Sequence, residues 1–137
     1  MRKTPTIERK ILTRIARKKS NVLLREDFLD LGGYDQVGRV LKGLAAQGKI
    51  VRIGYGLYSK ARTSTLTGEP VPVAPLPTIA KEALKRIGVE VVPSRAESAY
   101  NDGRSTQVPT GRLIGVKKRV NRKIGFKNAT VEYEFIS

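Results

Sequence analysis

Residues 35–58 constrain the fold of this 137-residue chain more than any other stretch. Apolar residues recur at helical spacing from Val37 to Leu44, and Gly48 follows at a point where a helix would end. Two short apolar runs then flank Gly54-Tyr55-Gly56, and glycines on both sides of one aromatic suit the tip of a tight hairpin. The segment therefore predicts a helix, a glycine stop and a two-stranded hairpin in direct succession.

Three further elements are expected before this segment. An apolar stripe of isoleucines and a leucine predicts a first helix from about residue 6 to residue 18. Residues 22–24 suit a short strand, and residues 25–31 suit a second short helix with Phe28, Leu29 and Leu31 turned inward. Gly32-Gly33 would close that helix, and Asp35 would be the N-cap of the third. This order of elements is typical of a winged helix-turn-helix, with the third helix as recognition helix and the hairpin as wing.

The second half of the chain predicts a smaller module behind a linker. Prolines at 70, 72, 75 and 77 favour extended backbone, so residues 63–77 are interpreted as a semi-rigid linker or as a strap over the surface. A helix is expected over residues 78–86, a long loop over 94–111, and strands over 89–92, 113–120, 124–126 and 130–136. The last strand alternates apolar and acidic residues, as a half-exposed antiparallel strand does. We therefore predict an α+β fold: a winged helix-turn-helix over residues 1–62 and a small C-terminal α+β domain with antiparallel strands over residues 78–137.

Composition argues against several classes of protein. The chain has no cysteine and no histidine, which removes the usual zinc ligands, the thiol nucleophiles and the commonest general base. We expect no enzyme activity, no metal site and no cofactor. No apolar run approaches the ~20 residues that a membrane span needs, and no apolar stretch follows the basic N-terminus. A cytoplasmic location without membrane contact is the resulting expectation.

The charge is strongly positive and unevenly placed. The net charge is +15, and residues 1–62 hold fifteen Lys/Arg against five Asp/Glu. Such a balance makes nucleic acid the first partner to consider. Basic residues of the first helix and of the segment before it are candidates for phosphate contact: Arg2, Lys3, Arg9, Lys10 and Arg14. The alternative is that they form an ordinary solvated helix face.

Within the recognition helix and wing, the outward-facing residues are the candidates for DNA contact. Gln36 and Arg39 lie near the helix N-terminus, and both types of side chain make bidentate contacts to purines in the major groove. Lys42 lies on the same face, and the wing contributes Lys49, Arg52 and Tyr55. The alternative for each is an ordinary solvent-exposed position. In the C-terminal domain, strand alternation would gather a second basic patch on one sheet face. This patch is a further candidate for DNA contact, the alternative being a solubilising surface: Lys117, Lys118, Arg119, Arg122 and Lys123.

Most of the chain resembles the AbiEi-type antitoxins and their relatives on bacterial mobile elements. The N-terminal part of the resemblance consists of Leu24-Arg25-Glu26-Asp27-Phe28, Gly32-Gly33-Tyr34-Asp35-Gln36-Val37, Arg39-Val40-Leu41, Leu44, Gly48-Lys49-Ile50-Val51-Arg52 and Gly54-Tyr55-Gly56-Leu57-Tyr58. The C-terminal part consists of Tyr100-Asn101-Asp102-Gly103, Gln107-Val108-Pro109-Thr110-Gly111-Arg112 and Arg122-Lys123-Ile124-Gly125-Phe126.

The resemblance implies a type IV toxin–antitoxin role. It implies a DNA-binding antitoxin that represses its own operon and counteracts a nucleotidyltransferase-like toxin without forming a stable complex. DNA contact then carries over to the matching positions Gln36, Arg39, Lys42, Arg52 and Tyr55.

The function expected from the sequence is therefore a sequence-specific DNA-binding transcriptional regulator. Its partner would be the double-stranded DNA operator of its own operon, on which it would assemble as a dimer. Two alternatives stay open: an RNA-binding module, and an antitoxin or inhibitor that binds a toxin protein directly.

Overall fold

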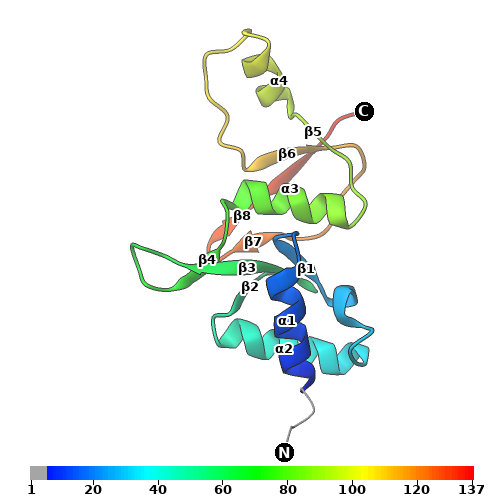
Figure 1. The fold of residues 1–137 in the computed structure, drawn as a ribbon. Coiled ribbons are helices and arrows are strands. Elements are labelled where there is room, and N and C mark those ends of the chain that lie inside the picture. Colours follow the sequence, from blue (N-terminus) through cyan, green and yellow to red (C-terminus); the bar gives the residue numbers. More distant parts are fainter. Residues whose placement is uncertain (1–5) are drawn as a thin grey trace, which may run out of the picture. The chain divides into compact units, whose positions relative to one another are not determined.

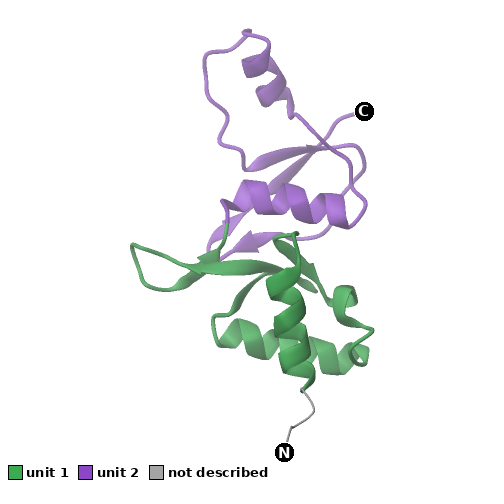
Figure 2. Cartoon of the chain, viewed as in Figure 1, with its two compact units in different colours: residues 1–73 green, residues 74–137 purple. Residues whose placement is uncertain are grey.

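The computed structural model describes residues 6–137, and the chain divides into two compact units, Met1–Val73 and Ala74–Ser137 (Figure 2). Both units combine helices with small sheets (Figure 1), which confirms the mixed α+β class. The boundary between the units follows Val73, within the stretch expected to be a linker.

Unit 1 has two longer helices, one 3-10 turn and a four-stranded sheet (Figure 1). In chain order its elements are α1 (Ile7–Arg17), β1 (Val22–Leu24), η1 (Arg25–Phe28), α2 (Tyr34–Ala46), β2 (Ile50–Gly54), β3 (Leu57–Thr63) and β4 (Pro70–Pro72). The strand order is β1-β3-β2, with β4 added to the later part of β3, and all pairs are antiparallel.

The core of unit 1 lies between α1, α2 and the sheet. The predicted stripes of both helices supply it, because Ile11, Val37, Leu41 and Leu44 are all fully buried. Phe28 of η1 is fully buried beside them. These contacts fix α2 against the sheet, so the opposite face of α2 is left to solvent.

Two details of the predicted N-terminal elements are wrong. The second helix is a single 3-10 turn that ends at Phe28, so α-helical spacing does not continue and Leu29 is 42% exposed instead of inward. The N-cap of α2 is Gly33, whose extended backbone accepts the N–H of Val37 at 2.9 Å, not Asp35. Asp35 lies in the first turn of α2, where a carboxylate favours the positive end of the helix dipole.

Glycine ends α2, as the sequence predicts. Gly48 has φ +76°, and the N–H of Lys49 reaches back to the carbonyl of Leu44 at 3.0 Å. A Cβ at Gly48 would lie 2.6 Å from Cγ of Pro70, so the turn is also closely packed against β4.

The predicted linker over residues 63–77 is mostly regular structure. It contains the end of β3, a hairpin turn, β4 and the start of α3 (Leu76–Arg86). Among the described strands, β4 pairs with β3 alone and is therefore an edge strand. Proline is compatible with such a strand, because the N–H groups on its outer side form no hydrogen bond within the sheet. The extended backbone that the prolines impose therefore forms a strand instead of a spacer.

Unit 2 begins with α3, and six short elements follow that helix (Figure 1). They are β5 (Val91–Val92), α4 (Arg95–Asn101), β6 (Leu113–Val116), β7 (Gly125–Phe126), β8 (Ala129–Thr130) and β9 (Glu132–Phe135). Strands β5, β6 and β9 form one sheet, and β7 and β8 form a hairpin. Ile79, Ala83, Leu84 and Ile114 are fully buried and mark the core of this unit.

The prediction of antiparallel strands holds for β5–β6 and β7–β8 but is wrong for the last strand. β9 runs parallel to β6, pairing Leu113 with Glu132 and Val116 with Phe135. Residues 117–131, which include the β7–β8 hairpin, are long enough for the crossover that a parallel pair requires. Phe135, one of the apolar residues of the predicted alternation, is 42% exposed, because alternation marks two faces without stating which one is covered.

The long loop expected over residues 94–111 contains the helix α4. Oγ of Ser94 accepts the N–H of Glu97 at 3.1 Å, and the carboxylate of Glu97 accepts the N–H of Ser94 at 3.1 Å. This reciprocal pair is a capping box, and its Ser-x-x-Glu spacing was present in the sequence. The four residues that follow Ser94 all lie in α4, and the cap is the sequence signal that the expectation of a loop missed.

Candidate functional site

The exposed face of α2 holds the three residues predicted for the recognition helix. Gln36, Arg39 and Lys42 are all exposed, while Val37 and Leu41 on the other side are fully buried. Oε1 of Gln36 lies 3.1 Å from the position that a Cβ would take at Gly32, so this side chain folds back toward the segment entering α2. Arg39 and Lys42 are one helical turn apart along the face. The structure thus brings two cations and one amide together on a single solvent-exposed helix face.

The hairpin β2–β3 carries the predicted wing residues. Its tip is the two-residue turn Tyr55-Gly56, and Gly56 has φ +65°, a conformation that favours glycine. The ring of Tyr55 is 71% exposed at this tip. Nε of Arg52 donates to the carbonyl oxygen of Gly54 at 3.2 Å, which lays the Arg52 side chain along the hairpin. Lys49 is exposed just before β2 begins.

One cluster that the sequence did not reveal lies where η1, α2 and the hairpin tip meet. The guanidinium carbon of Arg25 stands 4.0 Å from the ring centroid of Tyr34, in a cation–π contact. The side chains of Tyr34 and Tyr55 share a hydrogen bond. The N–H of Arg25 donates to the carbonyl of Gly56 at 3.3 Å. We call Arg25, Tyr34 and Tyr55 the junction cluster.

Gly38 is the sequence signal that could have indicated this cluster. A glycine inside a helix costs stability, and it is often present because another group approaches the backbone closely. A Cβ at Gly38 would lie 1.9 Å from Nη2 of Arg25 and 2.5 Å from its Cζ. Only glycine therefore leaves room for the Arg25 guanidinium to lie on α2.

The electrostatics of the junction cluster act on Tyr34. The hydrogen bond from Tyr55, and then that from Arg25, lowers the pKa of Tyr34 below the usual value of a phenol, with the positive charge of Arg25 acting in the same direction. Partial desolvation and the negative charge of Asp35 oppose this shift. Tyr34 is 51% exposed, so the cluster is open to solvent beside the exposed face of α2.

The basic residues of α1 divide into two kinds. Arg9 and Lys10 are exposed, whereas Arg14 forms an ion pair with Asp30 and also donates to the carbonyl of Asp27 at 3.0 Å. The hydrogen bond from Arg14 lowers the pKa of Asp30 below its usual range. The other two candidates of this group, Arg2 and Lys3, lie outside the described residues.

A positively charged groove of about 410 Å³ runs along α1. It is lined by Lys10, Thr13, Arg14, Arg17 and Lys18. Nζ of Lys18 lies 3.6 Å from a carboxylate oxygen of Asp27, and the Lys60 side chain donates to the carbonyl of Lys18. Asp27 and Asp30 thus offset part of the positive charge, while Lys10 and Arg17 add to it.

The second basic patch does not form as predicted. The strand expected over residues 113–120 ends at Val116, because its partners end there: β5 begins the pairing at Val91 and β9 ends it at Phe135. The five candidates of this patch, Lys117, Lys118, Arg119, Arg122 and Lys123, are exposed in the loop that follows. They lie in a loop, with Val120 and Asn121 between the first three and the last two, and not on one face of a sheet. The guanidinium of Arg119 lies 5.4 Å from the ring centroid of Phe135, which holds one of them near β9.

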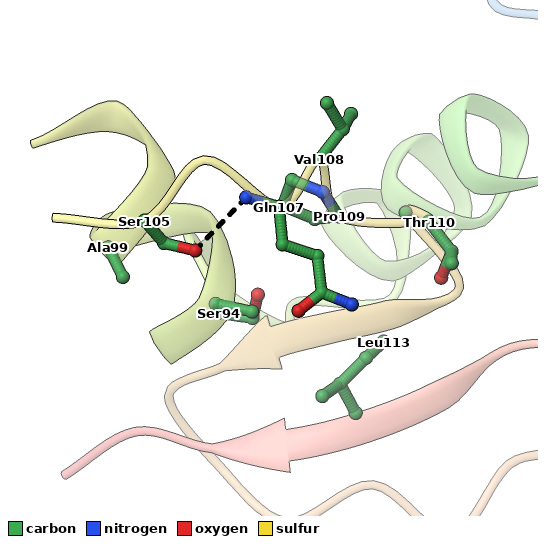
Figure 3. Close-up of a pocket in the computed structure, with 10 residues that line it drawn as sticks. Ser94, Ala99, Ser105, Gln107, Val108, Pro109, Thr110 and Leu113 are labelled. Carbon is green, nitrogen blue, oxygen red and sulfur yellow. Dashed lines mark hydrogen bonds between the residues drawn. The ribbon is translucent and has the colours of Figure 1, made fainter. Parts of the chain in front are cut away.

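Unit 2 also contains a pocket of about 270 Å³ beside α4 (Figure 3). Residues 105–111 form one wall, where the N–H of Gln107 donates to Oγ of Ser105 at 3.2 Å, and Leu113 lines another side. Among the described residues that line it, none carries a charged side chain. The pocket therefore offers hydroxyl, amide and apolar contacts, without an acid, a base or an ion pair.

Within residues 6–137, no three His, Cys, Asp or Glu side chains are grouped in a way that could hold a metal ion. Across the described part of the chain, none of the helices has the length and apolar character needed to cross a membrane.

Comparison with known protein families gives a match over most of the chain. The model of a family of unknown function, DUF6088, matches residues 7–134. Neither the curated proteins nor the solved structures contain a match to this chain. The family match spans nearly all of both units, and the chain therefore belongs to the DUF6088 family.

Proposed function

We propose that unit 1 binds duplex DNA as a winged helix-turn-helix, with α2 as its recognition helix and the β2–β3 hairpin as its wing. The observation that carries the proposal is the exposed face of α2, where Gln36, Arg39 and Lys42 lie together. An α-helix fits the major groove of B-form DNA, and arginine and glutamine are suited to purine edges there.

The topology of unit 1 supports this proposal. Helix α1, strand β1, the short turn η1, helix α2 and the β2–β3 hairpin follow one another in the order of a winged helix-turn-helix, and the sheet order is β1-β3-β2. The hairpin tip carries an exposed tyrosine, and Arg52 lies along one of its strands. In this arrangement the helix contacts base edges and the wing contacts the neighbouring backbone or minor groove.

The charge of the protein supports nucleic acid as the partner. The net charge of +15 gives an electrostatic contribution to binding that does not depend on base sequence. The exposed cations Arg9 and Lys10 and the groove on α1 extend the positive surface of unit 1 beyond α2. They would contact phosphates and set the register of the protein on the duplex.

The resemblance to AbiEi-type antitoxins extends the proposal to a biological role. In that role the protein represses its own operon, binds the operator as a dimer in the cytoplasm, and counteracts a nucleotidyltransferase-like toxin without a stable complex. The extension concerns regulation and depends on DNA binding by unit 1.

A titration with competing nucleic acids tests the proposed function. The full-length protein would be titrated against a labelled duplex from upstream of its own gene, with scrambled duplex and structured RNA as competitors, at ~50 and ~200 mM salt. We expect the upstream duplex to be preferred at both salt concentrations. Added salt weakens the phosphate contacts to every duplex, whereas contacts to base edges depend much less on salt. Equal binding to all three polymers, lost at higher salt, would overturn sequence-specific binding. Preference for the RNA would favour the RNA-binding alternative, since the deep, narrow groove of A-form RNA does not admit a helix.

A further inference from the structure

The junction cluster connects the two parts of the molecule that the proposed function uses. Arg25 makes three contacts: its guanidinium lies over the Tyr34 ring in the first turn of α2, it rests against the backbone at Gly38, and its N–H is bonded to Gly56 in the hairpin turn. Tyr55 at the hairpin tip closes the cluster through its hydrogen bond with Tyr34. One side chain thus contacts the recognition helix at two points, and its backbone contacts the wing.

These contacts are not needed for the core of unit 1. The core residues of α2 are Val37, Leu41 and Leu44, on the opposite side of the helix from solvent, and Tyr34 and Tyr55 are 51% and 71% exposed. A cluster with two tyrosines this exposed contributes little buried apolar area. Its contacts instead restrict how the tip of the hairpin lies against the start of α2.

We propose that Arg25 is a positioning residue for DNA recognition, which fixes the wing tip relative to the N-terminal turn of α2. This inference rests on the proposed function. A recognition helix and a wing must reach their groove and their phosphates at the same time, so a mobile wing would weaken discrimination between sequences more than attraction to the backbone. Arg25 acts through Tyr34 and Tyr55 and needs no contact of its own with a base.

Gly38→Ala is the most direct test variant. The added methyl group would occupy the place of the Arg25 guanidinium, and the three atoms nearest to it all belong to the flexible end of that side chain. The guanidinium must therefore move away while the helix backbone stays, and alanine favours a helix interior. Gly43→Ala is the matched control for the Arg25 contact. It makes the same substitution in the same helix, but a Cβ at Gly43 would have no described atom within 4 Å. Arg25→Ala removes the contact directly, and Arg25→Lys keeps the charge without the planar group.

The first measurement follows the ionisation of the tyrosines in the protein without DNA, by the ultraviolet absorbance of the phenolate. The chain has five tyrosines, and burial raises the pKa of Tyr58 and of Tyr133, so Tyr34 should ionise ahead of both. Tyr34→Phe identifies its transition. We expect that transition to move to higher pH in Gly38→Ala and in Arg25→Ala, and to stay in place in Gly43→Ala. An unchanged transition in both test variants would overturn the contact between Arg25 and Tyr34.

The second measurement is the ratio of affinities for the upstream duplex and the scrambled duplex. We expect Gly38→Ala and Arg25→Ala to lower this ratio by about 10-fold while binding to scrambled duplex changes little, and the control Lys85→Ala, on the exposed side of α3 in unit 2, to keep the wild-type ratio. Arg25→Lys should restore only part of it, because lysine lacks the planar stacking group. A wild-type ratio in both test variants would overturn the positioning role. Absence of any preference in the wild-type protein would instead overturn the proposed function, and the tyrosine titration would still report whether the contact exists.

Discussion

Individual residues of α2 differ sharply in what they contribute. Val37 and Leu41 hold the helix to the core, Gly38 leaves room for Arg25, and Arg39 lies exposed on the opposite face. The apolar pattern of the sequence predicted the first and the last of these roles, because burial and exposure follow helical spacing. It did not predict the junction cluster, since the partners Arg25 and Tyr55 come from outside the helix. Contacts between elements depend on the tertiary fold, which the spacing of residues within one element does not encode.

Arg39→Ala tests the recognition face at the scale of one side chain. Loss of a bidentate contact to a base should lower the affinity for the upstream duplex by about 1–3 kcal/mol and relax discrimination against scrambled duplex. The control is Lys85→Ala, which removes one exposed charge from α3 in unit 2. Fluorescence anisotropy with both duplexes measures the two affinities. Equal losses on both duplexes would assign Arg39 to phosphate contact instead of base contact.

At the scale of elements, the helix and hairpin of residues 35–58 were predicted well and several boundaries elsewhere were not. Strong periodicity predicts the helix, and Gly48 and Gly56, which both have positive φ, specify the turns locally. The strand β4 was missed because prolines disfavour strands except at an edge, and the sequence does not show which strand is an edge. The parallel pairing of β9 was missed for a similar reason, since direction depends on how residues 117–131 cross over.

Gly48→Ala and Gly43→Ala make a matched pair that tests the end of α2. Alanine at position 48 must adopt a left-handed conformation at φ +76° and meets Pro70 at 2.6 Å, so we expect a loss of at least ~1–2 kcal/mol in the free energy of unfolding. Alanine at position 43 lies inside the helix with open space around it, and we expect a gain of roughly 0.5–1 kcal/mol. Urea denaturation followed by circular dichroism measures both. Equal stabilities for the two variants would contradict the geometry of this turn.

Ser94→Ala tests the cap of α4 in unit 2. Ser94 is buried and its Oγ accepts the N–H of Glu97, so its removal should cost about 0.5–2 kcal/mol. Ser98→Ala, inside the same helix, is the control. Burial raises the pKa of Glu97, but the N–H of Ser94 and the charge of Lys81 outweigh it and lower the pKa overall. The contribution of the cap is therefore present above the unfolded pKa and is lost as pH falls through the lower folded pKa. Stability curves of wild type and Ser94→Ala that remain parallel on acidification would contradict this assignment.

The whole molecule is a strongly basic protein of two units, and the first unit carries the larger share of the net positive charge, +9 against +6. Each phosphate neutralised should add about 0.9 to the slope of log affinity against log salt. Neutralising Arg2, Lys3, Arg9 and Lys10 together should therefore flatten the slope on every duplex, without changing discrimination. The comparison variant neutralises Lys117, Lys118, Arg122 and Lys123 in the loop of unit 2. If neutralising Arg2, Lys3, Arg9 and Lys10 leaves the slope unchanged, these four residues do not contact DNA phosphates.

The central claim is that unit 1 contacts duplex DNA through the face of α2 and the tip of the β2–β3 hairpin. Amide chemical shifts of the full-length protein, recorded by NMR as the upstream duplex is added, test it most directly. We predict that the largest changes fall on residues 34–43 and 52–57, with smaller ones along α1. Large changes confined to residues 117–123, with α2 and the hairpin unmoved, would contradict the account and place the interface on unit 2.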